Sequence, residues 1–240
     1  MRRGAAALCA VLLSGCAQLV PAPAAAPAAD PHAAWSRVLE RFVDEEGRVD
    51  FAALARERAD LDAYVAWVYR SGPRHLAEHI NAYNALAMYN VLDSGIPRSL
   101  DGPALTEFFF LRKLAVGGVP MSLYAYESDI IRPFGEERVH FALNCMVRGC
   151  PRLPRTPFSE ATLEAALERE TRRFLAEPRN VRVDHAARTV YLSEIFRFYT
   201  RDFLDKAPTL VDYVNRHRSP PIPPGYRVGF VPYDWTLNLP

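Results

Sequence analysis

The chain has 240 residues, half of them hydrophobic, and a formal net charge of +1 at pH 7. Such a nearly neutral chain lacks the strongly basic surface that binds nucleic acid, so no nucleic-acid partner is expected. The length and apolar content suit one globular domain with its own core.

The first residues have the pattern of a signal peptide. A short basic start is followed by an apolar run over residues 5–13, which is too short to span a bilayer because a membrane helix needs about 20 residues. The sequence Leu13-Ser14-Gly15-Cys16 then resembles the lipobox of bacterial lipoproteins, in which the cysteine is acylated and becomes the new N-terminus. We therefore expect a signal peptide over residues 1–15 and a lipid on Cys16. The alternative is an ordinary secretory signal cut after residues 24–26.

The residues after Cys16 bear on where the protein resides. Ala17 stands where an Asp would favour the inner membrane, so the resemblance to lipoproteins implies the periplasmic face of the outer membrane. The lipid would make the membrane a partner of the chain. Residues 16–32 are rich in proline and alanine and are expected to form a tether. The single domain is expected over residues 33–240.

Helices are predicted in the first half of this domain. Apolar residues recur at helical spacing over residues 33–46, 51–69 and 74–92. Gly95 and Pro97 follow the third of these segments, as is typical beyond a helix C-terminus.

The second half mixes short strands with helices. Hairpins are predicted at residues 113–122, around Gly117-Gly118, and at residues 181–192. Alternating apolar residues predict a strand at 139–144 and another at 226–233, and helices are expected at 159–175, 193–203 and 208–215. The expected class is therefore α+β, with a helical N-terminal half, β-hairpins and a small, mostly antiparallel sheet.

Residues 139–151 carry the densest group of reactive side chains. A thiol becomes a nucleophile when a nearby imidazole favours its ionised form, so Cys150 and His140 are a candidate nucleophile and base. Three alternatives remain open. Cys145 and Cys150 could form a disulfide in an oxidising compartment, the two could bind zinc with His140, or both could be inert buried residues.

A second motif lies at the start of the third predicted helix. His75-Leu76-Ala77-Glu78-His79 matches the H-x-x-E-H pattern of inverted zinc proteases, with Glu78 as the base. No third ligand is specifically placed in the sequence, and a solvated helix edge explains the same residues. No cofactor is therefore expected.

Further polar residues are candidates for the same site. Asn81 and Asn84 lie on a predicted helix that asparagine does not favour, so they are expected to bind substrate, orient an imidazole or brace a loop. Asp234 could orient His140 by the logic of a catalytic triad. Arg132 and Arg152 could recognise a carboxylate.

Several stretches together resemble the family called "domain of unknown function 547". They are Ile80-Asn81-Ala82-Tyr83-Asn84-Ala85-Leu86, Val139 to Cys145, Gly149-Cys150-Pro151-Arg152-Leu153, Leu192 to Phe203, and Tyr233-Asp234-Trp235-Thr236-Leu237-Asn238. The resemblance implies that His140, Cys150, Asn81, Asn84 and Asp234 belong to shared motifs, but it brings no activity with it. The family usually has aromatic residues where this chain has Glu78-His79, which weakens the zinc-protease interpretation, and small residues where it has Met146-Val147-Arg148.

The leading hypothesis is a thiol-dependent hydrolase or acyltransferase that acts on a peptide or amide, with a cysteine-peptidase-like fold. The alternative is a non-catalytic envelope lipoprotein that binds a ligand or protein and contains a structural disulfide. The second alternative is a zinc hydrolase that uses His75 and His79.

Overall fold

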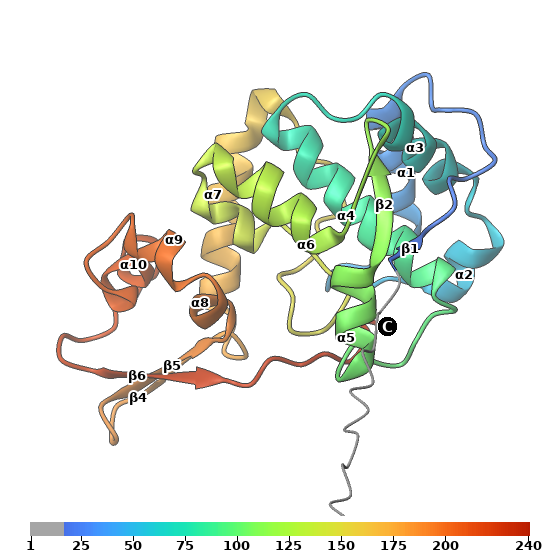
Figure 1. Ribbon diagram of the computed structural model, residues 1–240. Coiled ribbons are helices and arrows are strands. Elements are labelled where there is room, and N and C mark those ends of the chain that lie inside the picture. The colour runs from blue at the N-terminus through green and yellow to red at the C-terminus, as the bar shows by residue number, and fades with distance from the viewer. Residues whose placement is uncertain (1–16) are drawn as a thin grey trace, which may run out of the picture.

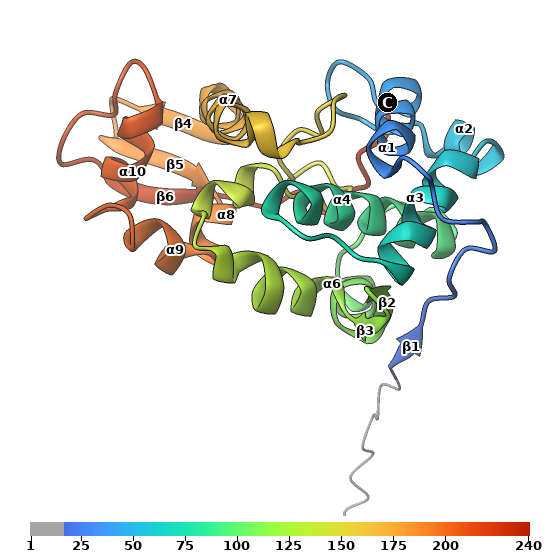
Figure 2. The same ribbon diagram turned by 90° about the horizontal axis from the view of Figure 1, so that it is seen from above.

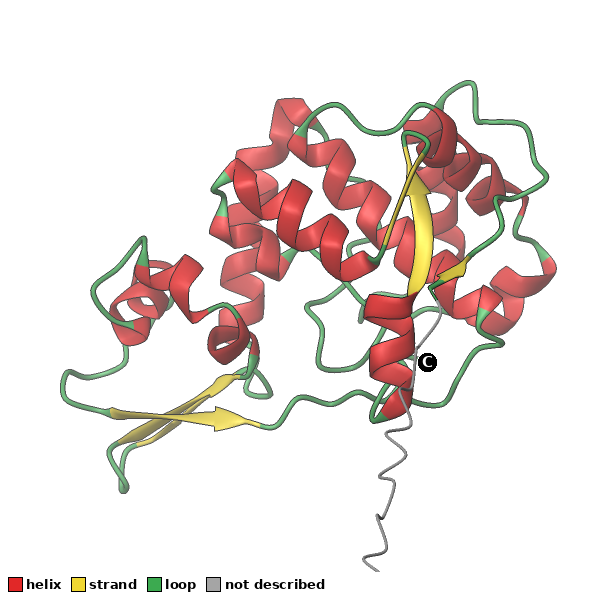
Figure 3. Cartoon of the chain, viewed as in Figure 1, coloured by secondary structure: helices red, strands yellow, loops and turns green. Residues whose placement is uncertain are grey.

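The computed structural model describes residues 17–240, so the expected signal peptide and Cys16 lie outside the described residues. Helices make up most of a larger body, and a smaller part contains a sheet with short helices beside it (Figures 1 and 3). After the last strand, the chain runs back to the larger body and ends there (Figure 1). This arrangement confirms the α+β class.

The larger body is built around α4 (Leu76–Asp93), in which 14 of 18 residues are buried. It is preceded by α1 (Pro31–Phe42), α2 (Phe51–Arg56) and α3 (Ala59–Arg70). The side chains of Asp30 and Asp50 cap α1 and α2 by accepting from backbone N–H groups of the first turn. Residues 51–69 form two helices instead of the single one predicted, because Glu57 leaves the helical conformation at φ −132°.

The strands form two mixed sheets. β1 (Gln18–Leu19) is parallel to β2 (Arg112–Val116), which is antiparallel to β3 (Val119–Met121). β4 (Val181–Asp184) is antiparallel to β5 (Thr189–Ser193), which is parallel to β6 (Arg227–Val231). Both predicted hairpins and the last strand are confirmed, but the expected mostly antiparallel sheet is wrong because each sheet contains one parallel pair.

The remaining helical elements connect these parts. They are α5 (Pro103–Thr106), η1 (Glu107–Leu111), α6 (Leu123–Ala125), η2 (Tyr126–Ile131), η3 (Arg132–Phe134), η4 (Glu137–Phe141), η5 (Glu160–Thr162), α7 (Leu163–Ala176), α8 (Ile195–Phe198), α9 (Thr200–Leu204) and α10 (Leu210–His217). Seen from above, α4 runs through the middle of the larger body (Figure 2), and Phe174 and Leu175 at the C-terminal end of α7 share a core with β4 and β5.

The predicted strand at 139–144 is wrong. Residues 137–141 form the 3₁₀ helix η4, and the N–H groups of Ala142 and Leu143 both point back to the carbonyl of Val139. The alternation of apolar and polar residues predicted a strand with one exposed face, but residues 139–144 are all buried. Val139 packs in the core around α4, whereas Phe141 packs in the core beneath β4–β6, so η4 joins the two.

The predicted tether is also wrong for its first residues, which pack on the domain. Gln18 and Leu19 pair with β2, and Val20 is 1% exposed. The hydroxyls of Tyr69 and Tyr89 donate to the carbonyls of Val20 and Pro21, at 3.2 and 2.9 Å. Proline lacks an N–H but keeps its carbonyl, and tyrosines of the domain bind the carbonyls of this segment. Within residues 17–240, no helix combines the length and the apolar character needed to cross a bilayer.

Candidate functional site

The loop after η4 brings both cysteines into the interior. Asn84 of α4 fixes the start of the loop, since its amide donates to the carbonyl of Ala142 at 3.0 Å and accepts from the N–H of Asn144 at 2.7 Å. Asn144 then bonds the carbonyl of Pro151 at 2.6 Å, which closes the loop at its other end. Met146 adopts a left-handed φ of 70°, held by the bond from its N–H to the Asn144 side chain.

Cys145 and Cys150 form a disulfide across this loop, with their Cα atoms 6.3 Å apart. Cys150 therefore has no free thiol in this form, and the structure does not contain the predicted Cys150–His140 dyad. Of the alternatives left open by the sequence, the disulfide is the one found. The hydroxyl of Tyr233 donates to Cys150 Sγ at 3.2 Å, and the N–H of Cys145 reaches the same sulfur at 3.1 Å.

On one side of the disulfide lies a cavity of about 370 Å³, which we call the aromatic cavity. Cys145 lines it, together with eight aromatic side chains. These are Tyr83, Phe109, Phe110, Tyr124, Phe198, Tyr199, Tyr233 and Trp235. Phe110, Tyr124 and Phe198 are 40%, 52% and 45% exposed, so they form an apolar rim in contact with solvent.

The polar residues of the aromatic cavity are Glu127, Arg132 and His140. His140 Nε2 lies 2.8 Å from Asp202 Oδ2, and Arg132 donates two hydrogen bonds to the same carboxylate at 2.7 and 2.8 Å. The imidazole stacks on Tyr199 with ring centroids 3.7 Å apart. Its Nδ1 lies 3.6 Å from Glu127 Oε1 and is buried without a hydrogen-bond partner among residues 17–240. The arrangement holds a buried histidine between two carboxylates in the wall of the cavity.

The charges around His140 shift two pKa values. Burial opposes a charge on the imidazole, but the carboxylates of Asp202 and Glu127 outweigh this effect and raise the pKa of His140 above its usual value. The hydrogen bonds from His140 and Arg132 hold the pKa of Asp202 well below its usual range. The site therefore favours an imidazolium paired with a carboxylate, and such perturbed groups in a cavity are typical of functional sites.

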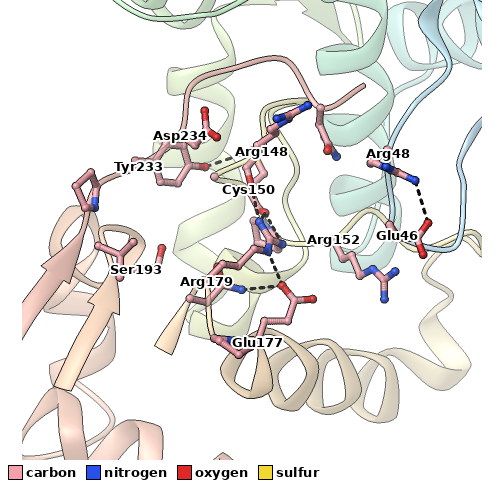
Figure 4. Close-up of a pocket in the computed structure, with 17 residues that line it drawn as sticks. Glu46, Arg48, Arg148, Cys150, Arg152, Glu177, Arg179, Ser193, Tyr233 and Asp234 are labelled. Atoms are coloured by element: carbon pink, nitrogen blue, oxygen red, sulfur yellow. Dashed lines mark hydrogen bonds and ion pairs between the residues drawn. The ribbon is translucent and has the colours of Figure 1, made fainter. Parts of the chain in front are cut away.

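On the other side of the disulfide lies a larger cleft of about 780 Å³, the arginine cleft (Figure 4). Cys150 lines it, and four arginines surround it. These are Arg48, Arg148, Arg152 and Arg179. Arg179 pairs with Glu177 at 2.7 Å, and it also donates to the carbonyls of Arg148 and Cys150. Tyr233 and Pro151 line both the cleft and the aromatic cavity, so the disulfide loop separates the two.

The other predicted site residues are distributed over both sides. Asn81 is buried and makes two bonds to the backbone of Phe158, at 2.7 and 2.9 Å, so it braces a loop. Asp234 lines the arginine cleft and accepts from Thr236, and the carboxylate paired with His140 is that of Asp202 instead. Arg152 lines the same cleft and donates to the carbonyl of Glu45.

The zinc motif does not form a cluster. His79 is buried, with its Nδ1 2.9 Å from the hydroxyl of Tyr126, whereas His75 lies 3.5 Å from Glu78 and Glu160. Among residues 17–240, no group of three or more His, Cys, Asp or Glu side chains is placed to hold a metal ion. The geometry gives this hypothesis no support.

Sequence reasoning missed the partners of His140. Asp202 lies 62 residues further along the chain, on α9, and Glu127 lies on η2. Asp202 and Tyr233, the residue that bonds the disulfide, each fall inside a stretch that carries the family resemblance. That resemblance could have indicated both residues as parts of the site. Glu127 had no such signal.

The fold and site define a small α+β protein with a disulfide between an aromatic cavity and an arginine-lined cleft. Residues 71–175 match the model of a family described as "Protein of unknown function, DUF547", and this part of the chain belongs to that family. The matched segment contains α4, the disulfide loop, His140 and Glu127, whereas Asp202 and Tyr199 lie outside it. Comparisons with curated proteins and with solved structures found no match.

Proposed function

We propose that the protein is a cell-envelope lipoprotein that binds a small ligand in the aromatic cavity, with the Cys145–Cys150 disulfide in its wall. The observation that carries this proposal is the cavity itself. Small-molecule sites are typically concave, of about 300–1,000 Å³, and largely apolar with a few fixed polar groups. The aromatic cavity has this size and this composition.

The lining indicates a class of ligand. The aromatic side chains favour a flat or apolar body, and the exposed aromatic rim is the kind of surface that marks a binding site. Glu127, Arg132 and His140 supply the charged and polar groups of the lining. We therefore expect an aromatic or alicyclic compound that bears at least one hydrogen-bonding group.

Indole is a suitable probe because it has a flat body and one N–H donor. Its binding to the full-length protein is to be measured by ligand-observed NMR. Phe198→Ala should weaken binding at least fivefold because Phe198 lines the cavity. Phe134→Ala is the matched control, since Phe134 is 48% exposed, against 45% for Phe198, and does not line the cavity. Equal affinity of the two variants for indole would contradict the proposal.

The location in the envelope rests on Cys16. We expect Cys16→Ser to move the protein from the membrane fraction to the soluble fraction and to remove the mass of the acyl chains. Cys9→Ser is the control, because Cys9 lies in the expected signal peptide and its loss should leave the mature mass unchanged. A mature chain that begins after residue 26 and carries no lipid would refute the anchor.

A thiol-dependent hydrolase remains the second candidate, because Cys145 and His140 line the same cavity. Two equivalents of a small thiol would first reduce the disulfide and leave as their own disulfide, and the Cys145 thiolate would then attack an amide carbonyl. The amine would leave with a proton from His140, and water would then release the acid. In this form Cys145 takes the role that the sequence analysis gave to Cys150.

The hydrolase is tested by alkylating the reduced protein across a pH series and mapping the peptides by mass. Cys145 should react well below the free-cysteine pKa of about 8.5, and His140→Ala should abolish the shift. Alkylation of Cys145 as an ordinary free thiol would exclude the hydrolase.

A further inference from the structure

The two sulfur atoms of the disulfide are not equivalent. Cys145 lines the aromatic cavity, whereas Cys150 lines the arginine cleft. A molecule in the aromatic cavity therefore reaches the disulfide on the Cys145 side. In thiol–disulfide exchange, the attacked sulfur forms the new bond and the other sulfur must leave as a thiolate.

Two hydrogen-bond donors converge on the sulfur that would leave. The N–H of Cys145 lies 3.1 Å from Cys150 Sγ, and the hydroxyl of Tyr233 lies 3.2 Å from the same atom. Cys145 Sγ has only the longer contact with Tyr233, at 3.6 Å. Hydrogen bonds stabilise a thiolate, and Cys150 Sγ receives two of them at short distance. Cys150 is therefore the better leaving group.

The loop is held in place by bonds other than the disulfide. The N–H groups of Arg148 and Gly149 donate to the carbonyls of Thr236 and Asp234, at 2.9 and 2.8 Å. Asn144 bonds Pro151, as described above. A disulfide that closes so short a loop restricts the unfolded chain less than one that closes a long loop. Opening it should therefore leave the surrounding fold intact.

We propose that Cys145–Cys150 is a thiol–disulfide exchange site, at which a small organic thiol enters the aromatic cavity and attacks Cys145. The thiolate sulfur bonds to Cys145 Sγ, the S–S bond breaks, and its electron pair remains on Cys150. A second thiol then attacks the mixed disulfide and releases a symmetrical organic disulfide. Overall, two thiols are oxidised to one disulfide, and the protein gains the two protons and two electrons as two cysteine thiols.

The experiment uses the oxidised full-length protein with 2-mercaptoethanol as the thiol. Brief exposure followed by iodoacetamide should give the mercaptoethanol adduct on Cys145 and the carbamidomethyl group on Cys150, as mapped by mass. Tyr233→Phe should slow the opening about tenfold, because it removes one hydrogen bond to the developing thiolate and keeps the ring. Tyr213→Phe is the control, since Tyr213 is a buried tyrosine that donates to Glu137 in the other core.

Three results would overturn the proposal. They are an adduct on Cys150, an opening rate that Tyr233→Phe does not change, and a disulfide that opens only in denaturant. The exchange goes beyond ligand binding and is tested independently of it, because a protein that fails to bind indole would still form the Cys145 adduct.

Discussion

Replacing Asp202 with Asn tests whether the buried ion pair at His140 stabilises the fold. Asp202 accepts hydrogen bonds from His140 and Arg132, and the side chain of His140 is 1% exposed. Loss of a charge-assisted bond to such a buried group costs about 1.5–3 kcal/mol. Arg132 is 32% exposed and can be rehydrated, so its share is at most about 1 kcal/mol. We expect a destabilisation of about 2–4 kcal/mol near pH 6, or about 4–16 °C in Tm.

The effect should depend on pH in a definite direction. Because the pKa of His140 is raised in the folded protein, its protonation stabilises the fold fully below the unfolded value of about 6.5. That stabilisation is lost as the pH rises through the raised pKa. Asp202 stays ionised over this range because its pKa is lowered. The destabilisation by Asp202→Asn should therefore fall as the pH rises through the raised pKa of His140, because the neutral imidazole loses its charge-assisted bond and the bonds from Arg132 contribute at most about 1 kcal/mol.

Thermal unfolding followed by circular dichroism at pH 6 and pH 9 measures both quantities. Asp60→Asn is the matched control, because Asp60 also accepts two bonds from one arginine, Arg37, but at the surface and without a histidine. It should cost less than about 1 kcal/mol at either pH. If Asp202→Asn is equally destabilising at pH 6 and pH 9, or no worse than Asp60→Asn, the stabilising role assigned to the imidazolium is refuted.

Two further substitutions test how the rest of the site and the N-terminal segment are held. Asn84→Ala leaves two buried backbone groups without partners, so the free energy of unfolding in urea should fall by about 2–5 kcal/mol. A decrease below about 1 kcal/mol would show that other contacts fix the loop. Val20→Ala should cost about 1–2.5 kcal/mol because Val20 is buried, whereas the 62% exposed Leu19 should tolerate alanine. Equal effects at these two positions would contradict the packing of the N-terminal segment on the domain.

Local patterns in the sequence predicted most of the elements correctly. Helical spacing found α1, α3, α4 and α7, and the turn at Gly117-Gly118 found the hairpin of β2 and β3. The strand expected at residues 139–144 failed because alternation identifies a strand only where one face is exposed. The packing of residues 18–21 was not predictable from their composition, because it depends on hydroxyls of Tyr69 and Tyr89 far along the chain.

The candidate site was harder to predict than the fold. Clustering in the sequence drew attention to His140, Cys145 and Cys150, and the disulfide is one of the alternatives that the sequence leaves open. The sequence could not show that the two cysteines line different cavities, or that Asp202 reaches His140 from another element. These relations arise from tertiary packing, on which local spacing carries no information.

The position of β1 has a consequence for how the molecule would sit on a bilayer. A proline-rich chain from 16 to 32 could extend about 50 Å, at about 3.1 Å per residue. Since β1 begins at Gln18, only Ala17 would separate a lipid on Cys16 from the folded chain. The distance from residue 16 to residue 18 is two residue steps, each of at most about 3.6 Å. The sheet β1–β3, with exposed Leu19 and Val119, would then lie against the lipid headgroups. Phe110, an exposed residue of the rim, lies two residues before β2 in the chain, so the rim and this sheet are joined directly.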